Sequence, residues 1–208
     1  MKRLILFLLI AASLTACMDS ENVLSAIDYA RMGENQMRHY HPVHPLHPDW
    51  SIAESGKIAI LRADQRSIKL SVRRPDQVVV RAGGKIIGHV RKTTNGATFE
   101  PIDPATASLD MTCAIAGIVD VHDKNQTVQY RIEETQVSTA TLRVRAISPH
   151  HYSMTTCQGC DAECTGSSIE TPMSTLGTAI LNTDALPLEP RAGLAWFVSK
   201  IAVCDLSR

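Results

Sequence analysis

The chain has 208 residues, with 21 basic and 21 acidic side chains and only 4% aromatic residues. This length is enough for one medium-sized domain with its own core. The balanced charge, without a basic patch or a long run of like charge, argues against a nucleic-acid partner, and the scarcity of aromatic residues argues against base stacking.

The first residues have the pattern of a signal peptide. Lys2 and Arg3 precede an apolar run over residues 4–12. A helix that spans a bilayer needs about 20 apolar residues, so this run is too short to span and is typical of the apolar region of a signal peptide. The run is followed by the tetrapeptide LTAC at residues 14–17.

This tetrapeptide resembles the lipobox of bacterial lipoproteins, in which an aliphatic residue and two small residues precede a cysteine. The resemblance covers the first 17 residues. It implies that residues 1–16 are removed and that Cys17 becomes a lipidated N-terminus, whose acyl chains anchor the protein to the membrane. The alternative is an ordinary signal peptide whose cleavage site happens to contain a cysteine.

The residue after Cys17 bears on which membrane is involved. In enterobacterial lipoproteins, Asp directly after the lipidated cysteine favours retention in the inner membrane. Met18 occupies that position here, and Asp19 follows one residue later. By this resemblance we expect the bacterial cell envelope, and the outer membrane rather than the inner one.

Residues 17–50 are expected to form a lipidated tether. Apolar residues recur at helical spacing within residues 19–38 and predict a short helix. The tract HYHPVHPLHPDW follows at residues 39–50. Proline fixes its own φ and keeps the preceding residue out of the α region, so the tract predicts a stiff polyproline II segment.

The three histidines of this tract fall on one edge of a polyproline II helix, because that helix has three residues per turn. Neighbouring pairs among His41, His44 and His47 are then about 9 Å apart at Cα, and two rings could converge on one metal ion. The outer pair is too far apart to share an ion. The tract is therefore a stiff spacer, a weak two-ligand metal site, or a segment recognised by an aromatic groove of a partner.

From Lys57 onward the apolar residues alternate with polar ones, which predicts strands. The clearest cases are residues 126–134, QTVQYRIEE, and residues 139–147, TATLRVRAI. Gly83-Gly84 and Asn95-Gly96 mark hairpin turns. We interpret AWFVSKIAV, residues 195–203, as a closing strand.

Together these elements predict a mainly β fold over residues 51–208: an antiparallel β-sandwich or a small barrel, preceded by the short helix and the Pro-rich spacer. Residues 149–172 interrupt the strand pattern. We expect a long Cys-rich loop there.

Five cysteines remain besides Cys17, and disulfides are expected in the oxidising envelope. They are Cys113, Cys157, Cys160, Cys164 and Cys204. An odd number leaves one thiol over. Cys113 shares its parity with core-facing residues of a predicted strand, so we favour it as the leftover thiol and two bridges among the other four, although Cys113 could also reach the loop cysteines.

The cluster CQGCDAEC, residues 157–164, has three open interpretations. It could be a structural disulfide knot, a thiolate site for zinc or copper built from Cys157, Cys160 and Cys164, or a redox-active CxxC pair. Haem attachment is excluded because Asp161, not histidine, follows the second cysteine.

The sequence contains no GxSxG, SxxK or HExxH motif, so we nominate no catalytic residue and no resident cofactor. We predict a non-enzymatic envelope lipoprotein that presents a β-rich binding or assembly domain to other envelope proteins. The alternative is a metal-binding or metal-delivering lipoprotein that uses the His-Pro tract and the Cys cluster.

Overall fold

The alternation of apolar and polar side chains produces antiparallel strands. The computed structural model describes residues 37–40, 50–63, 65–114, 117–157 and 164–203. The chain divides into a unit of residues 1–37 and a unit of residues 38–208, and the account below concerns the second. Its described residues form fourteen strands that pair in sequence order in one continuous antiparallel sheet.

The first seven strands are β1 Arg38–Tyr40, β2 Trp50–Ser55, β3 Ile58–Ala63, β4 Arg66–Arg74, β5 Gln77–Ala82, β6 Lys85–Thr93 and β7 Gly96–Pro101. The next seven are β8 Leu109–Cys113, β9 Ile118–His122, β10 Thr127–Glu133, β11 Gln136–Ser138, β12 Leu142–Ser148, β13 His151–Cys157 and β14 Cys164–Glu170. Two helices follow, α3 Thr175–Leu181 and α4 Leu188–Lys200.

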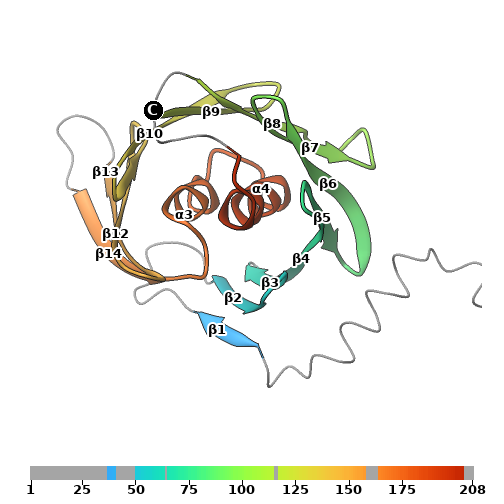
Figure 1. Cartoon of the computed structure of the whole chain (residues 1–208), viewed down its shortest axis with the longest axis horizontal. Helices are drawn as coiled ribbons and strands as arrows, with labels where there is room; N and C mark the ends of the chain where they lie inside the picture. The colour runs from blue at the N-terminus through green and yellow to red at the C-terminus, as the bar shows by residue number, and fades with distance from the viewer. Residues whose placement is uncertain (1–36, 41–49, 64, 115–116, 158–163, 204–208) are drawn as a thin grey trace, which may run out of the picture. The chain divides into compact units, whose positions relative to one another are not determined.

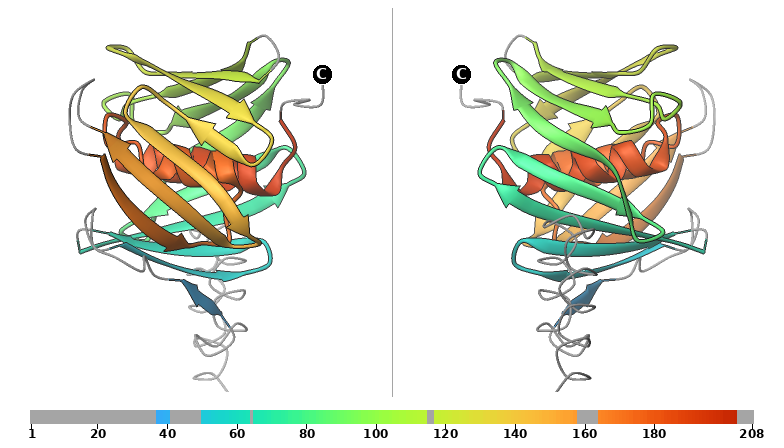
Figure 2. Two further views of the ribbon diagram at one scale, coloured as in Figure 1. Left: turned by 90° about the vertical axis from the view of Figure 1, so that its left-hand side faces the viewer. Right: turned by 90° about the vertical axis from the view of Figure 1, so that its right-hand side faces the viewer.

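The sheet curls around the two helices (Figure 1). Side views show the strands running obliquely past the helix pair (Figure 2). Helix α4 contacts β4 to β7, and α3 contacts β11 and β12. The inner face of the sheet and the surfaces of both helices therefore form one apolar core.

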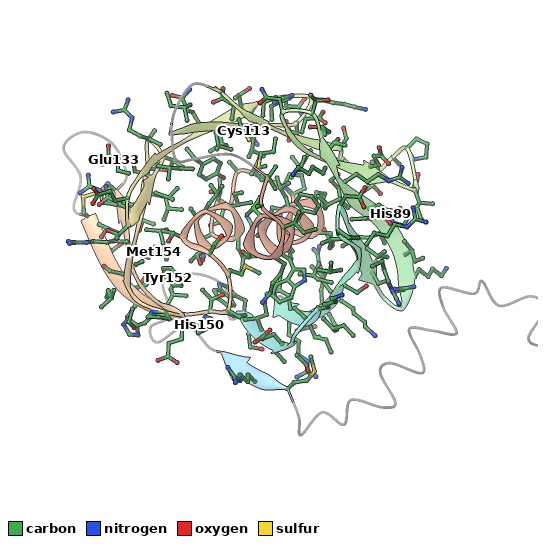
Figure 3. All side chains as sticks on the ribbon, viewed as in Figure 1. His89, Cys113, Glu133, His150, Tyr152 and Met154 are labelled. Atoms are coloured by element: carbon green, nitrogen blue, oxygen red, sulfur yellow. A yellow bond between two sulfur atoms is a disulfide. The ribbon has the colours of Figure 1, made fainter. Side chains whose placement is uncertain are left out.

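The core contains large side chains from the helices and from the inner face of the sheet. Trp196 and Phe197 of α4, and Phe99 and Tyr130 of the sheet, are fully buried. Tyr152 and Met154 of β13 point toward the helices (Figure 3), and both are buried. The Tyr152 hydroxyl donates to the carbonyl oxygen of Met173 at 2.5 Å, so this buried polar group has a partner.

Helix α4 lies so close to the sheet that one position has no room for a side chain. A Cβ added at Gly193 would be 2.6 Å from Cγ2 of Val80 and 3.1 Å from Cγ2 of Val90. Carbon atoms in van der Waals contact are about 3.5–4.0 Å apart. Glycine at this position therefore permits the close approach of α4 to β5 and β6.

The predicted mainly antiparallel β fold is confirmed, and the strands form one curled sheet rather than two stacked sheets. Gly83 and Gly84 form the predicted β5–β6 turn, both with positive φ. Asn95 and Gly96 lie at the β6–β7 turn.

Three other expectations are wrong in part. Residues 195–200 belong to helix α4, so the expected closing strand at residues 195–203 does not form. Residues 149–172 contain β13 and β14 instead of a long loop, so only the tip between them, residues 158–163, lies outside the described residues. β1 falls inside the expected tether of residues 17–50 and pairs with β2. Most of the predicted helix at residues 19–38 and of the His-Pro tract lies outside the described residues.

Candidate functional site

A cleft of about 1150 Å³ lies beside β10, where the neighbouring strand β11 ends. β11 has three residues and pairs with β10 only from Arg131 to Glu133. Residues 127–130 of β10 continue past the end of β11, and no other described strand pairs with them on that side. We call this space the β10 cleft; β10, the β11–β12 turn, the ends of β13 and β14, and residues 182–185 line it.

β11 is short because a tight turn follows it. The Thr139 N–H donates to the carbonyl oxygen of Leu142 at 2.7 Å, which closes the turn. The Thr139 hydroxyl also accepts from the N–H groups of Thr141 and Leu142, at 3.3 and 3.0 Å. A threonine hydroxyl at the first position of a turn favours such turns. The chain therefore reverses into β12, and among the described strands none pairs with the first half of β10 on that side.

The orientation of the β10 backbone follows from one hydrogen bond. The N–H of Ile132 donates to the carbonyl oxygen of Gly117 at 2.7 Å, on the β9 side. Backbone groups of alternate residues in a strand point to opposite sides, so the N–H and C=O groups of Thr127 and Gln129 point away from β9 and into the β10 cleft. The cleft is thus bounded by an open strand edge.

The floor of the cleft is formed by residues 182–185, which belong to the α3–α4 link, and buried side chains hold it. The carbonyl oxygen of Thr183 accepts from Nη1 of Arg191 at 2.6 Å. Asn182 accepts from Nε1 of Trp50 at 3.4 Å and donates from Nδ2 to the carbonyl oxygen of Thr178 at 2.8 Å. The link is therefore fixed to α4, α3 and β2.

Tyr130 fixes the link to β10. Its hydroxyl donates to Oγ1 of Thr183 at 2.8 Å, and that hydroxyl in turn donates to the carbonyl oxygen of Ala179 at 2.9 Å. Burial raises the pKa of the Tyr130 phenol well above its usual range, and the hydrogen bond to Thr183 and the charge of Arg191 only partly offset this. Tyr130 is therefore a neutral, buried group that connects β10 to the α3–α4 link.

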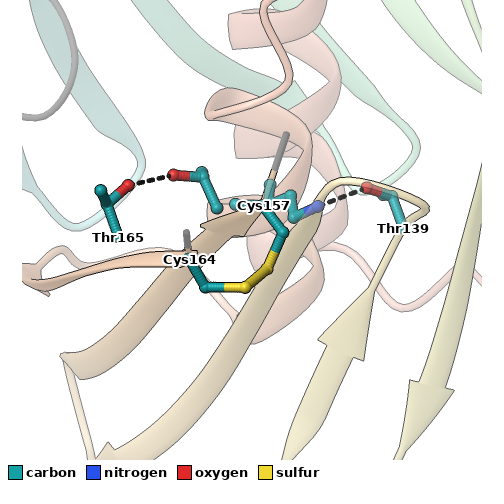
Figure 4. Close-up of a disulfide and its surroundings, with 6 residues drawn as sticks. Thr139, Cys157, Cys164 and Thr165 are labelled. Carbon is teal, nitrogen blue, oxygen red and sulfur yellow. Dashed lines mark hydrogen bonds between the residues drawn. A yellow bond between two sulfur atoms is a disulfide. The ribbon is translucent and has the colours of Figure 1, made fainter. Parts of the chain in front are cut away.

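The wall opposite β10 is closed by a disulfide between Cys157 and Cys164, which joins the ends of β13 and β14 (Figure 4). Beside it, the hydroxyls of Thr156 and Thr165 are 2.9 Å apart. Six of the residues that line the cleft are threonines: Thr127, Thr139, Thr141, Thr156, Thr165 and Thr183. The cleft therefore presents hydroxyl and backbone groups, which can donate and accept hydrogen bonds as in a polar binding site.

Both basic and acidic side chains line the cleft, so its charge is not of a single sign. Arg131 and Arg143 extend from β10 and β12, on either side of Ser138 in the same cross-strand row. Glu133 and Asp184 also line the cleft. The balance of two basic and two acidic side chains favours recognition by hydrogen bonds over attraction of a strongly charged ligand.

The residues nominated from the sequence fall into two groups. Cys17, the three histidines of the His-Pro tract, Cys160 and Cys204 lie outside the described residues, so their predicted roles stay predictions. Cys157 and Cys164 are disulfide-bonded to each other, as in the structural interpretation of the cluster. In this form neither offers the thiolate that a zinc or copper site at residues 157–164 would need.

Cys113 was expected to be the leftover free thiol, and this expectation is wrong because Cys113 is disulfide-bonded. Its partner is not among the described cysteines, since the other two are bonded to each other. The parity argument that placed Cys113 toward the interior holds in part, since its side chain is half-buried at the end of β8. Parity could not reveal a partner distant in sequence.

Known proteins offer no guide to this site. No protein-family model, no curated protein and no solved structure matches the chain. In the part of the chain that the structure describes, no three or more His, Cys, Asp and Glu side chains gather as a metal site would require. No helix among those residues is long and apolar enough to cross a bilayer.

The sequence did not reveal the β10 cleft. The sequence feature behind the cleft is the short run QVS, residues 136–138, which forms β11 between the β10–β11 turn and the turn at Thr139. Residues 126–134 and 139–147 were predicted as two strands, with no strand predicted between them. β11 lies between them, so the gap beside β10 becomes visible only in the assembled sheet.

Proposed function

We propose that this protein is a non-enzymatic envelope lipoprotein, anchored by lipid on Cys17, whose β-rich domain binds another envelope protein through the β10 cleft. The lipobox-like LTAC motif supports the anchor and favours the outer membrane. The observation that carries the binding role is the cleft itself. It combines an open strand edge, hydroxyl-bearing walls and a floor held by buried side chains.

The residues that line the β10 cleft are held in place by buried side chains and a disulfide, which favours binding. Arg191, Tyr130 and Trp50 hold the floor, and the Cys157–Cys164 bond closes the far wall. A site formed by fixed groups loses little conformational freedom when a ligand binds, so more of the contact energy contributes to affinity. The metal-binding alternative is not advanced, because the disulfide leaves two of its proposed ligands without thiolates.

The anchor is tested by replacing the proposed lipid acceptor. Cys17→Ser should abolish incorporation of radiolabelled palmitate and release the protein from the membrane fraction. The wild-type chain should be labelled and sediment with outer-membrane vesicles. Labelling that persists in Cys17→Ser would overturn the anchor assignment.

The binding role is tested by photocrosslinking in living cells. A benzoylphenylalanine at Thr141, in the β11–β12 turn that lines the cleft, should form an adduct with one protein. The control position is Arg91, an exposed residue of β6, which lies across the sheet from β10 in Figure 1. Equal adducts from both positions, or none from Thr141, would contradict binding at the cleft.

A further inference from the structure

Building on the proposed function, we infer that the β10 cleft recognises an extended polypeptide segment, which adds to the sheet as a strand along the open edge of β10. Recognition would act on the segment's backbone more than on its side chains. The ligand is thus a proline-free extended segment of another protein. Strand addition of this kind draws affinity from main-chain hydrogen bonds.

The first observation is the direction of the backbone groups. Thr127 and Gln129 each present one N–H and one C=O to the cleft, since the hydrogen bond from Ile132 to Gly117 sets the parity of the strand. Their spacing is that of a regular β-ladder, because the register between β9 and β10 runs without a shift from Thr127 to Arg131. An incoming strand would find two donors and two acceptors already aligned.

The second observation is that the open stretch of β10 lacks three of the features that protect sheet edges. Natural edge strands are commonly interrupted by lysine, proline or a bulge, which prevent pairing with other chains. The open stretch of β10 reads TVQY, residues 127–130, and contains none of these. Bulges or register shifts do occur elsewhere in the sheet, between β4 and β5, β5 and β6, and β12 and β13.

The third observation is the space beside the edge. The cleft volume of about 1150 Å³ exceeds that of many small-molecule sites, which are roughly 300–1,000 Å³. At about 3.3 Å per residue, the open edge spans about 10 Å and fits a segment of three to four residues. The β11–β12 turn at Thr139 closes one end, so the segment would have to leave the sheet or end there.

Proline offers a test that alters the backbone but not the strand's own pairing. Gln129→Pro removes the N–H that points into the cleft and places the ring where an incoming strand would lie. Proline is tolerated in edge strands when its missing N–H faces away from the neighbouring strand, so the β9–β10 pairing should survive. Gln129→Ala is the matched control. Both variants lose the 3.0 Å hydrogen bond from Gln129 to Asp120, but only the proline variant loses the backbone donor.

The experiment selects short random peptides displayed on phage against the mature wild-type protein. Peptides that bind wild type should bind Gln129→Pro at least about tenfold more weakly than they bind Gln129→Ala, because only the proline variant lacks the backbone donor. Circular dichroism and thermal melting establish that each variant is folded. If Gln129→Pro fails to fold, Thr127→Pro at the start of the same edge takes its place.

Two results would overturn strand addition. One is that no peptide is enriched; the other is that the selected peptides bind the proline and alanine variants equally. Either leaves the cellular adduct from Thr141 unaffected, so strand addition can fail while binding at the cleft stands. Loss of that adduct would instead remove the proposed function itself.

Discussion

Replacing Gly193 by alanine gives the sharpest test of how α4 packs inside the sheet. In an exposed helix, glycine-to-alanine stabilises by about 1 kcal/mol because alanine has the higher helix propensity. Here the new methyl carbon would be 2.6 Å from Cγ2 of Val80, a strand residue whose side chain is fully buried. Valine has few alternative rotamers, so the helix or the strand would have to move.

The two effects have opposite signs, and the structure decides between them. Forcing a methyl group into a packed core costs about 1–3 kcal/mol. After the propensity gain is subtracted, we expect Gly193→Ala to lower the free energy of unfolding by up to about 2 kcal/mol. For a domain of this size, that lowers Tm by up to roughly 8 °C.

A double-mutant cycle identifies the contact. Val80→Ala alone should cost about 2–3 kcal/mol, from the lost methyl groups and the remaining cavity. In the double variant the new methyl group on α4 would occupy part of that cavity. The loss of stability in the double variant should therefore be at least about 1 kcal/mol smaller than the sum of the two single losses. Urea denaturation measures all four proteins. A stabilised Gly193→Ala, or additive losses, would refute the close packing of α4 on β5.

Three further predictions concern the surroundings of the β10 cleft. Because burial raises the pKa of Tyr130, its neutral form stabilises the fold below about pH 10, and stability should fall above that by up to about 1.4 kcal/mol per pH unit; Tyr130→Phe should reduce this alkaline loss in urea titrations at pH 9–11. Arg191→Met should cost about 2–4 kcal/mol, since its side chain, only 10% exposed, holds the α3–α4 link, whereas Arg66→Met, which removes a 58% exposed side chain from an ion pair, should cost under about 1 kcal/mol; equal losses would contradict the role of the buried arginine. The Cys157→Ala/Cys164→Ala variant should lose about 2–3 kcal/mol, the entropy of a short closed loop, and an unchanged denaturation midpoint would show that the bond does not form.

The strands were predictable because half of their residues face water. In β10 and β12, buried Tyr130 and Val144 alternate with exposed Gln129 and Arg143, and this two-residue period is visible in the sequence. Gly83 and Gly84 were predictable because a tight hairpin requires positive φ, which glycine adopts without strain. Local rules suffice wherever one side of an element faces solvent.

The helices were not predictable for the opposite reason. In α4, residues 190–197 are all buried because the curled sheet surrounds the helix. A helix buried all round has no polar face and hence no 3.6-residue period. The apolar run at residues 195–203 could therefore be mistaken for a strand.

The candidate site was hidden because tertiary contacts form it. The β10 cleft depends on the length of β11 relative to β10, and on the position of residues 182–185 beneath the gap. Cys157 and Cys164 were nominated correctly as disulfide candidates. Their pairing follows from the hairpin register, which places the two residues opposite each other at the ends of β13 and β14.

Backbone amide hydrogen exchange, measured by NMR with and without a peptide selected on the wild-type domain, tests binding at the β10 edge most directly. The N–H groups of Thr127 and Gln129 should exchange at least about tenfold more slowly in the complex. The N–H of Val128, which faces β9, should change little. Unchanged exchange at Thr127 and Gln129 with the peptide bound would contradict the account.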